Sequence, residues 1–387
     1  MKRIFLILIA AALLLPMLPH AGAVSLEVAG KSAVLMDAAT GTVLYEKNAH
    51  EALAPASVTK VMTMLLIMEA IDSGKIRWED MVTASETAAA KGGSQIYLKV
   101  GESMSVSDMV KSIAVSSAND CACAMAEHLA GSEQAFVEAM NTRAKELSMN
   151  DTNFVNCTGL DDDPDAQNHK TSAYDIAVMS RELLVNHPDI KKYTTIWMDT
   201  VRGGTFGLSN TNKLIRFYSG ATGLKTGFTS GAGYCLSATA EREGMELIAV
   251  VMGAQTSKER NAACKQLLDM GFANYALVTP QPQEETSVAV KLGSAESVRL
   301  IPGQQPRLLI DKGLKGSVTT DIALSEAITA PVAQGQELGR LTIRAGEKIL
   351  AEIPLVAETE VLRLTWGQLF ALVMKDIAMG SIPQDNS

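Results

Sequence analysis

The sequence predicts an α+β domain over residues 24–280, a small all-β domain over 281–360, and an amphipathic helix within 361–387. Segments with strand character stand at both ends of the first domain, with helical segments between them, which favours one sheet joining the early and late chain. After the TPQPQEE linker, short runs of alternating polarity indicate further strands. The final segment gathers its apolar residues on one helical stripe.

Residues 1–23 have the pattern of a secretory signal peptide. Lys2 and Arg3 precede an apolar stretch, and Ala21-Gly22-Ala23 offers a small-residue cleavage site. Because that site falls where a signal peptide needs it, we favour cleavage over the alternative of a membrane-spanning anchor. The mature protein is therefore expected to be exported and extracytoplasmic, in the cell wall or periplasm.

Composition narrows the function classes. The 387-residue chain is long enough for two domains, and its net charge of −9 argues against a nucleic-acid partner, which needs a basic face. Its five cysteines cannot all pair within one chain, and they show no CxxC or zinc-like spacing. We therefore interpret them as small buried residues rather than a disulfide framework.

The elements of the first domain follow from local pattern. Residues 32–48 predict two strands around an AATG turn, and a buried helix is expected from Ser57 to about Asp72. Beyond Asn210 the sequence predicts an antiparallel meander of three strands. Further helices are expected in four segments, with a turn-rich loop at 151–170. These helical segments are one ending near Ser116, 120–131, 132–147 and 171–186, followed by a closing helix at 261–277.

The C-terminal stripe has two interpretations. Arg363 and Lys375 interrupt its apolar run, which is too short to span a bilayer. A helix lying in the membrane interface, with Trp366 at the headgroup level, would anchor the protein peripherally to the outer face of the cytoplasmic membrane. The alternative is a helix docked on its own domain. The stripe comprises Leu362, Trp366, Leu369, Phe370, Val373 and Ile377.

Three short motifs carry the chemistry. Ser57 and Lys60 are three residues apart, which places them on one helical face. Burying a lysine at the start of a helix costs free energy unless the residue has a function or a partner. Ser117-Ala118-Asn119 stands at a break between two apolar helices. Lys225-Thr226-Gly227 lies on a predicted strand just before a glycine-rich turn. Each motif is short, but their combination in this order is specific.

Acyl transfer needs a nucleophile, a base and an oxyanion site. Ser57 would be the nucleophile and Lys60 its base, because a serine hydroxyl is inert at neutral pH without one. Burial and a second cation, Lys225, would lower the pKa of Lys60. The same helix start offers the Ser57 backbone N–H as an oxyanion donor.

In these motifs the sequence resembles the penicillin-recognising serine enzymes. More closely, it is similar to low-molecular-weight penicillin-binding proteins that act as D-alanyl-D-alanine carboxypeptidases, over nearly the whole chain. The resemblance implies their fold, an antiparallel sheet with a helical cluster followed by a β sandwich domain. It also implies a second oxyanion donor at the Phe228 N–H, a proton relay at Ser117 and a substrate-amide contact at Asn119.

Carboxylate recognition is also expected from this resemblance. Lys225 and Thr226 would bind the terminal carboxylate of the substrate, and Arg260 is a further candidate for the same group. Gly227 would allow close backbone approach. The peptide would lie along the strand edge and extend the sheet.

Rival functions are less consistent with the sequence. A histidine-based serine hydrolase lacks its G-x-S-x-G, and a metallopeptidase lacks its H-E-x-x-H. A class A β-lactamase would need a deacylating glutamate, but no glutamate lies between Glu146 and Glu182. A wall-binding module with a decayed site is the non-enzymatic alternative, although nothing in the three motifs is decayed.

The sequence therefore predicts an exported serine-type D-alanyl-D-alanine carboxypeptidase. It would remove the terminal D-alanine from the stem peptide of peptidoglycan, with β-lactams as covalent inhibitors and no metal or organic cofactor. The choice of carboxypeptidase over endopeptidase or transpeptidase rests on the resemblance.

Overall fold

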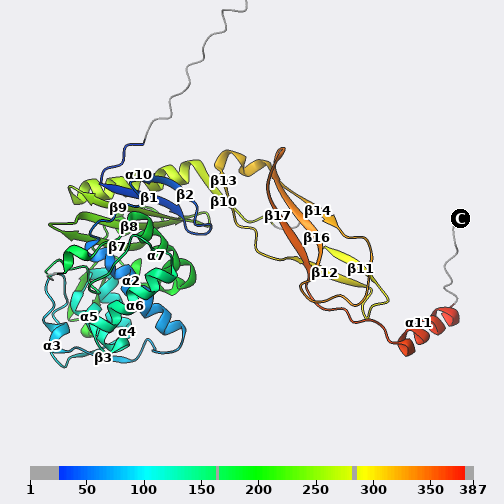
Figure 1. The fold of residues 1–387 in the computed structure, drawn as a ribbon, viewed down its shortest axis with the longest axis horizontal. Coiled ribbons are helices and arrows are strands. Elements are labelled where there is room, and N and C mark those ends of the chain that lie inside the picture. Colours follow the sequence, from blue (N-terminus) through cyan, green and yellow to red (C-terminus); the bar gives the residue numbers. More distant parts are fainter. Residues whose placement is uncertain (1–25, 163–164, 281–285, 380–387) are drawn as a thin grey trace, which may run out of the picture.

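A computed structural model describes residues 26–162, 165–280 and 286–379 of the chain, so the predicted signal peptide at 1–23 lies outside the described residues. The N-terminal domain and the smaller β domain stand side by side along the long axis, and helix α11 lies at the far end (Figure 1).

The centre of the N-terminal domain is a five-stranded antiparallel sheet in the order β2-β1-β9-β8-β7. Strand β1 pairs with β9, with Val34 opposite Val250, so the early and late parts of the chain meet in the sheet as predicted. Strand β7 forms one edge. The strands are β1 (Ser32–Asp37), β2 (Val43–Lys47), β7 (Ala221–Thr229), β8 (Gly233–Arg242) and β9 (Met245–Ala254).

Helices cover both faces of this sheet. Alternate residues of β1 point to opposite sides, with Val34 in the core under the helical cluster and Leu35 in the core under α10. The α10 helix (Ser257–Asn274) covers its face together with the short helix α9 (Leu214–Phe217), whose Leu214 belongs to the same core. The opposite cluster contains α2 (Lys60–Asp72), α4 (Val106–Ser116), α5 (Asn119–Ala130), α6 (Glu133–Glu146) and α7 (Ala173–Asn186), with short helices α3 (Glu86–Ala89) and α8 (Lys191–Thr194).

The structure corrects two predicted helix boundaries. The helix expected from Ser57 begins with a 3₁₀ turn over Ala56–Thr59, and its α-helical part starts at Lys60. The closing helix ends at Asn274, and residues Tyr275–Val278 form strand β10 instead. The sequence pattern also missed two short two-stranded sheets. These are β3 (Met81–Thr83) with β4 (Ser103–Ser105), and β5 (Met198–Val201) with β6 (Phe206–Ser209).

The C-terminal domain is all-β, as predicted. Six strands share the order β14-β16-β17-β12-β11-β15 around a core that includes Leu341, Ile343 and Leu355. The remaining strand, β13, pairs with β10 and so ties this domain to the end of α10. The strands are β11 (Ser287–Lys291), β12 (Ser297–Pro302), β13 (Leu308–Asp311), β14 (Val318–Leu324), β15 (Ile328–Thr329), β16 (Glu337–Ala345) and β17 (Lys348–Ala357).

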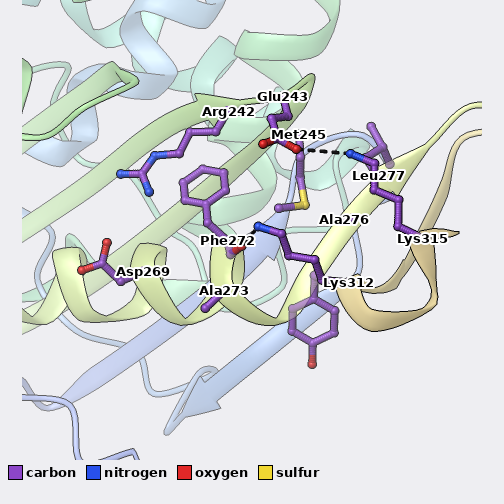
Figure 2. Close-up of a pocket in the computed structure, with 11 residues that line it drawn as sticks. Arg242, Glu243, Met245, Asp269, Phe272, Ala273, Ala276, Leu277, Lys312 and Lys315 are labelled. Carbon is purple, nitrogen blue, oxygen red and sulfur yellow. Dashed lines mark hydrogen bonds and ion pairs between the residues drawn. The ribbon is translucent and has the colours of Figure 1, made fainter.

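Polar contacts bridge the two domains around a cavity of about 360 Å³. Lys312 donates to the Phe272 carbonyl at 2.9 Å. Lys315 pairs with Glu243 at 3.2 Å, an ion pair that Figure 2 marks with a dashed line. None of the predicted site residues lines this cavity. It therefore belongs to the domain junction.

Helix α11 spans Trp366–Met379, so Leu362 lies outside the helix that was predicted to carry the apolar stripe. The stripe residues within α11 are largely uncovered. Trp366 is 88% exposed and Phe370 67% exposed, so the β domain does not bury them. In the part of the chain that the structure describes, we find no helix with the length and apolar character needed to cross a bilayer.

Candidate active site

The serine–lysine motif lies directly against edge strand β7. A Cβ built on Gly227 would fall 2.6 Å from the Pro55 carbonyl oxygen and 3.1 Å from the Ser57 backbone nitrogen. Only a residue without a side chain allows this approach. The first and third motifs are thus brought together, as the sequence predicted.

Lys60 holds its amine against the predicted nucleophile. Its Nζ lies 3.0 Å from Ser57 Oγ and donates to the Thr158 carbonyl at 2.7 Å. The side chain is fully buried. Burial lowers the pKa of Lys60 to about 7, against the opposing influence of Cys157 and Asp120. A large fraction of this lysine is therefore neutral near pH 7 and able to accept a proton.

Lys225 supplies a second buried amine at the same site. It is 1% exposed and donates to the Thr226 carbonyl at 2.8 Å. Burial, followed by the charges of Lys60 and Arg260, holds the pKa of Lys225 well below its usual range. The sequence predicted that Lys225 would lower the pKa of Lys60. In the structure, burial has that effect on Lys60, and the charge repulsion acts on Lys225.

The second motif presents two unpartnered polar atoms. Ser117 ends α4 in the left-handed conformation, with φ of 63°, and Asn119 begins α5. Asn119 Nδ2 donates to the Gly92 carbonyl at 2.7 Å, which fixes the direction of its amide. Ser117 Oγ and Asn119 Oδ1 are buried without a hydrogen-bond partner. Buried polar atoms are costly when they stay unpaired, so these two are available to accept a hydrogen bond from a ligand or from water.

The other predicted substrate contacts differ in accessibility. Thr226 is buried, and its Oγ1 donates to Thr211 Oγ1 at 2.7 Å. The Phe228 side chain is 53% exposed and packs on Tyr234, with ring centroids 4.3 Å apart. The backbone N–H that the resemblance assigns to Phe228 therefore lies on the same edge strand as Lys225.

Arg260 lies at the first turn of α10, behind strand β8. Its Nε donates to Asn261 Oδ1 at 3.1 Å, and Nη1 approaches the Cys235 carbonyl at 3.5 Å. Burial lowers the pKa of this guanidinium. The charge of Arg260 contributes to the lowered pKa of Lys225, whereas its hydrogen bonds go to Asn261 and to the Cys235 carbonyl.

The sequence predicted the loop at 151–170, but not that this loop encloses the nucleophile. Thr158 supplies the carbonyl that accepts from Lys60, and His169 contacts Thr59 within the first motif at 2.8 Å. A Cβ built on Gly159 would lie 1.9 Å from the Ala56 carbonyl oxygen. None of these residues belongs to a motif, because their roles depend on a loop about one hundred residues later in the chain folding back.

Cysteines and metal-ligating groups lie outside this chemistry. All five cysteines are free and buried, which confirms the interpretation as small buried residues. Within the described ranges, the group of Glu69, Glu182 and His187 is close enough to hold a cation. Arg143 already pairs with both of its carboxylates at 2.7 Å, so this group is a structural ion-pair network.

Comparison with known proteins agrees with this geometry. Residues 19–256 match the family described as D-alanyl-D-alanine carboxypeptidase, and residues 275–363 match the C-terminal domain of penicillin-binding protein 5. The chain is 45% identical to the D-alanyl-D-alanine carboxypeptidase DacF of Bacillus subtilis, over 93% of this chain and 95% of that protein. It is 33% identical to DacA of Escherichia coli, over 87% and 84%.

Solved structures give the same result. Penicillin-binding protein 5 from Haemophilus influenzae aligns with a TM-score of 0.73 at 32% identity, over 87% of this chain and 98% of that one. Penicillin-binding protein D2 from Listeria monocytogenes in its ampicillin-bound form aligns with a TM-score of 0.58 at 32% identity, over 64% and 99%. Both the penicillin-recognising fold and the resemblance predicted from the three motifs are confirmed, and the chain belongs to the D-alanyl-D-alanine carboxypeptidase family.

Proposed function

We propose that this protein is a serine-type carboxypeptidase that releases the terminal D-alanine from peptidoglycan stem peptides ending in D-Ala-D-Ala. The contact of Lys60 Nζ with Ser57 Oγ at 3.0 Å carries this proposal, because it places a base of lowered pKa against a serine nucleophile. Membership of the carboxypeptidase family supports the choice of substrate.

In the first half-reaction, neutral Lys60 takes the Ser57 proton as Oγ attacks the carbonyl carbon of the penultimate residue. The resulting oxyanion accepts hydrogen bonds from the Ser57 and Phe228 backbone N–H groups. The C–N bond then breaks, the leaving D-alanine receives a proton through Ser117, and the peptide stays on Ser57 as an ester. Water subsequently hydrolyses this ester.

The substrate would satisfy the groups that the free site leaves unsatisfied. Asn119 Nδ2 is committed to Gly92, so Oδ1 is the atom available to accept an N–H from the stem peptide. Lys225 and Thr226 would hold the terminal carboxylate. An arriving anion restores the charged form of a buried lysine, so its binding and the protonation of Lys225 support one another.

β-Lactams would acylate the same serine. Penicillin-binding protein D2 is solved in ampicillin-bound and cefotaxime-bound forms and aligns with this chain. Because no glutamate lies between Glu146 and Glu182, the chain lacks the deacylating residue that a class A β-lactamase would place there. We expect a long-lived penicilloyl ester.

The reaction can be tested by measuring free D-alanine released from a peptide ending in D-Ala-D-Ala. The parent protein should release it, penicillin should block the release, and Ser57→Ala should abolish it. Ser117→Ala should lower the rate by about 10²-fold or more, as expected for loss of a proton relay. A parent that binds penicillin covalently but releases no D-alanine would contradict the carboxypeptidase assignment.

Ser148→Ala is the matched control for Ser117→Ala. Ser148 also has a positive φ, of 58°, and it begins a Ser-Met-Asn sequence of the same S-x-N form. It belongs to none of the three motifs, so its variant should keep the parent rate. An equal loss in both variants would mean that Ser117 acts through folding alone.

We also propose that the protein is exported and held at the outer face of the cytoplasmic membrane. The N-terminal pattern supports export, and the exposed stripe with Trp366 and Phe370 supports an interfacial helix. A chain ending at Glu360 should lose vesicle binding and keep its D-alanine release. Equal vesicle binding by the shortened and full chains would contradict the anchor, and an exported protein that retains Lys2 would contradict signal cleavage.

A further inference from the structure

A buried hydrogen-bond relay reaches the nucleophile turn from a histidine outside all three motifs. We propose that His169, acting through Thr59, is a positioning residue that aims the Ser57 backbone N–H into the oxyanion site. This inference rests on the proposed acyl transfer and adds a residue to its machinery.

The relay has a defined direction. The Val155 N–H donates to His169 Nδ1 at 3.0 Å, so the neutral ring carries its proton on Nε2. His169 Nε2 lies 2.8 Å from Thr59 Oγ1 and donates to it. The Thr59 hydroxyl then directs its own proton to the Ala56 carbonyl, also at 2.8 Å. Both side chains are buried, so water does not compete for these bonds.

Anchoring the Ala56 carbonyl orients the next N–H. The Ala56 carbonyl and the Ser57 N–H belong to one planar trans peptide group, so they point in opposite directions. With the carbonyl held toward Thr59 and the loop, the Ser57 N–H is turned to the side of strand β7. There a Cβ built on Gly227 would lie 3.1 Å from the Ser57 nitrogen, which places this donor beside strand β7.

The turn needs such an anchor because it is strained. Ala56 has φ of 48°, in the left-handed region that disfavours residues with a Cβ. The enclosing loop is shaped around the carbonyl, since Gly159 leaves open the space where its Cβ would meet Ala56. Phe154 packs edge-on against the His169 ring, with centroids 5.7 Å apart, and fixes the ring plane.

The test separates acylation from binding. Benzylpenicillin acylation would be followed by stopped flow in the parent, Thr59→Val, Thr59→Ser and His169→Phe. Thr59→Val and His169→Phe should lower the acylation rate constant by about ten- to a hundredfold, as expected for a misdirected oxyanion donor. The dissociation constant of the non-covalent complex should change by less than about threefold. Thr59→Ser keeps the hydroxyl and should stay near the parent rate.

A peptide boronic acid supplies a second readout, because its tetrahedral adduct carries the oxyanion. Its affinity should fall by the same factor as the acylation rate, whereas an unreactive peptide should bind as before. Thr194→Val is the matched control. Thr194 is also buried and donates to a backbone carbonyl, that of Thr222 at 2.6 Å, so it loses a similar bond without contact with Ala56.

Thr59→Val decides the proposal even where His169→Phe fails to fold, because it removes one hydroxyl and keeps the side-chain shape. A folded Thr59→Val that acylates at the parent rate would overturn the proposal. A loss confined to the dissociation constant, or an equal loss in Thr194→Val, would also overturn it. Penicillin acylation is measured independently of D-alanine release, so a failure of the proposed carboxypeptidase reaction would show separately.

Discussion

The two lysines of the site have no charged partner in their hydrogen bonds. Lys60 contacts a hydroxyl and a carbonyl, and Lys225 donates to a carbonyl. Burial is the largest cause that disfavours the protonated amine, so the pKa values of both lysines fall, and the charges of Lys60 and Arg260 add to the effect on Lys225. For Lys60 this produces a base at neutral pH. For Lys225 it produces a site that a substrate carboxylate can stabilise.

Lys225→Met should therefore stabilise the fold while removing activity. The pKa of Lys225 is lower in the folded protein than in the unfolded chain. At any pH below the unfolded value, folding must therefore either bury the charged amine or release its proton, and both cost free energy. Removing about 1 kcal/mol of this cost would raise the Tm by roughly 2–4 °C. D-alanine release should fall by about 10²-fold or more.

Calorimetry and D-alanine release, measured on Lys225→Met and on a surface control, test the predicted gain in Tm and loss of activity. Lys192 is exposed and paired with Asp189, so Lys192→Met should change neither Tm nor rate appreciably. A Lys225→Met protein that melts clearly below the parent would show that Lys225 contributes to stability through its contact with Thr226.

The sequence predicts those site residues that lie close together in the chain and so form a short motif. Ser57 and Lys60 are neighbours in the chain, and so are Lys225 and Thr226. His169 could not be found this way, because it meets Thr59 across 110 residues of chain. The same holds for Gly92, whose carbonyl fixes Asn119.

Among the elements, the 3₁₀ turn at Ala56–Thr59 explains the serine–lysine contact. In a 3₁₀ helix, side chains three residues apart are nearly superimposed along the axis. This brings Lys60 over Ser57 more directly than the α-helix that the sequence predicted from Ser57. The tight turn is not evident from composition, because it depends on the positive φ of Ala56 and on the loop around it.

Gly159→Ala tests how closely that loop fits the turn. The glycine has φ of +80°, and an added Cβ would meet the Ala56 carbonyl carbon at 2.4 Å as well as its oxygen. Gly131 has a similar φ of +83° and nothing within 4 Å of the added atom. Gly131→Ala should therefore lose about 1–2 kcal/mol of unfolding free energy from backbone strain alone.

Gly159→Ala should lose about 3 kcal/mol or more, because the clash adds to the strain. Its acylation rate should also fall, since the displaced atom is the carbonyl that orients Ser57. Chemical denaturation and penicillin acylation measure the two effects. Equal losses in both variants would mean that the loop can move away from Ala56 at little cost.

At the scale of the whole molecule, the long elements were predictable and the junctions were not. The pairing of β1 with β9 follows from apolar strands at both ends of one domain, and that expectation is confirmed. Short pieces such as β3 and β10 have too few residues for a periodic signal. The contact of β10 with β13, and the cavity beside it, arise only once two domains are joined.

The central claim is that Lys60 activates Ser57 for acylation. The most direct measurement is the rate of benzylpenicillin acylation from about pH 5.5 to about pH 9, with the adduct mapped by mass spectrometry. Because the neutral amine is the active form, the rate should rise with pH through an apparent pKa of about 7, with a persistent ester on Ser57. A rate independent of pH across this range, or an adduct on another residue, would contradict the claim.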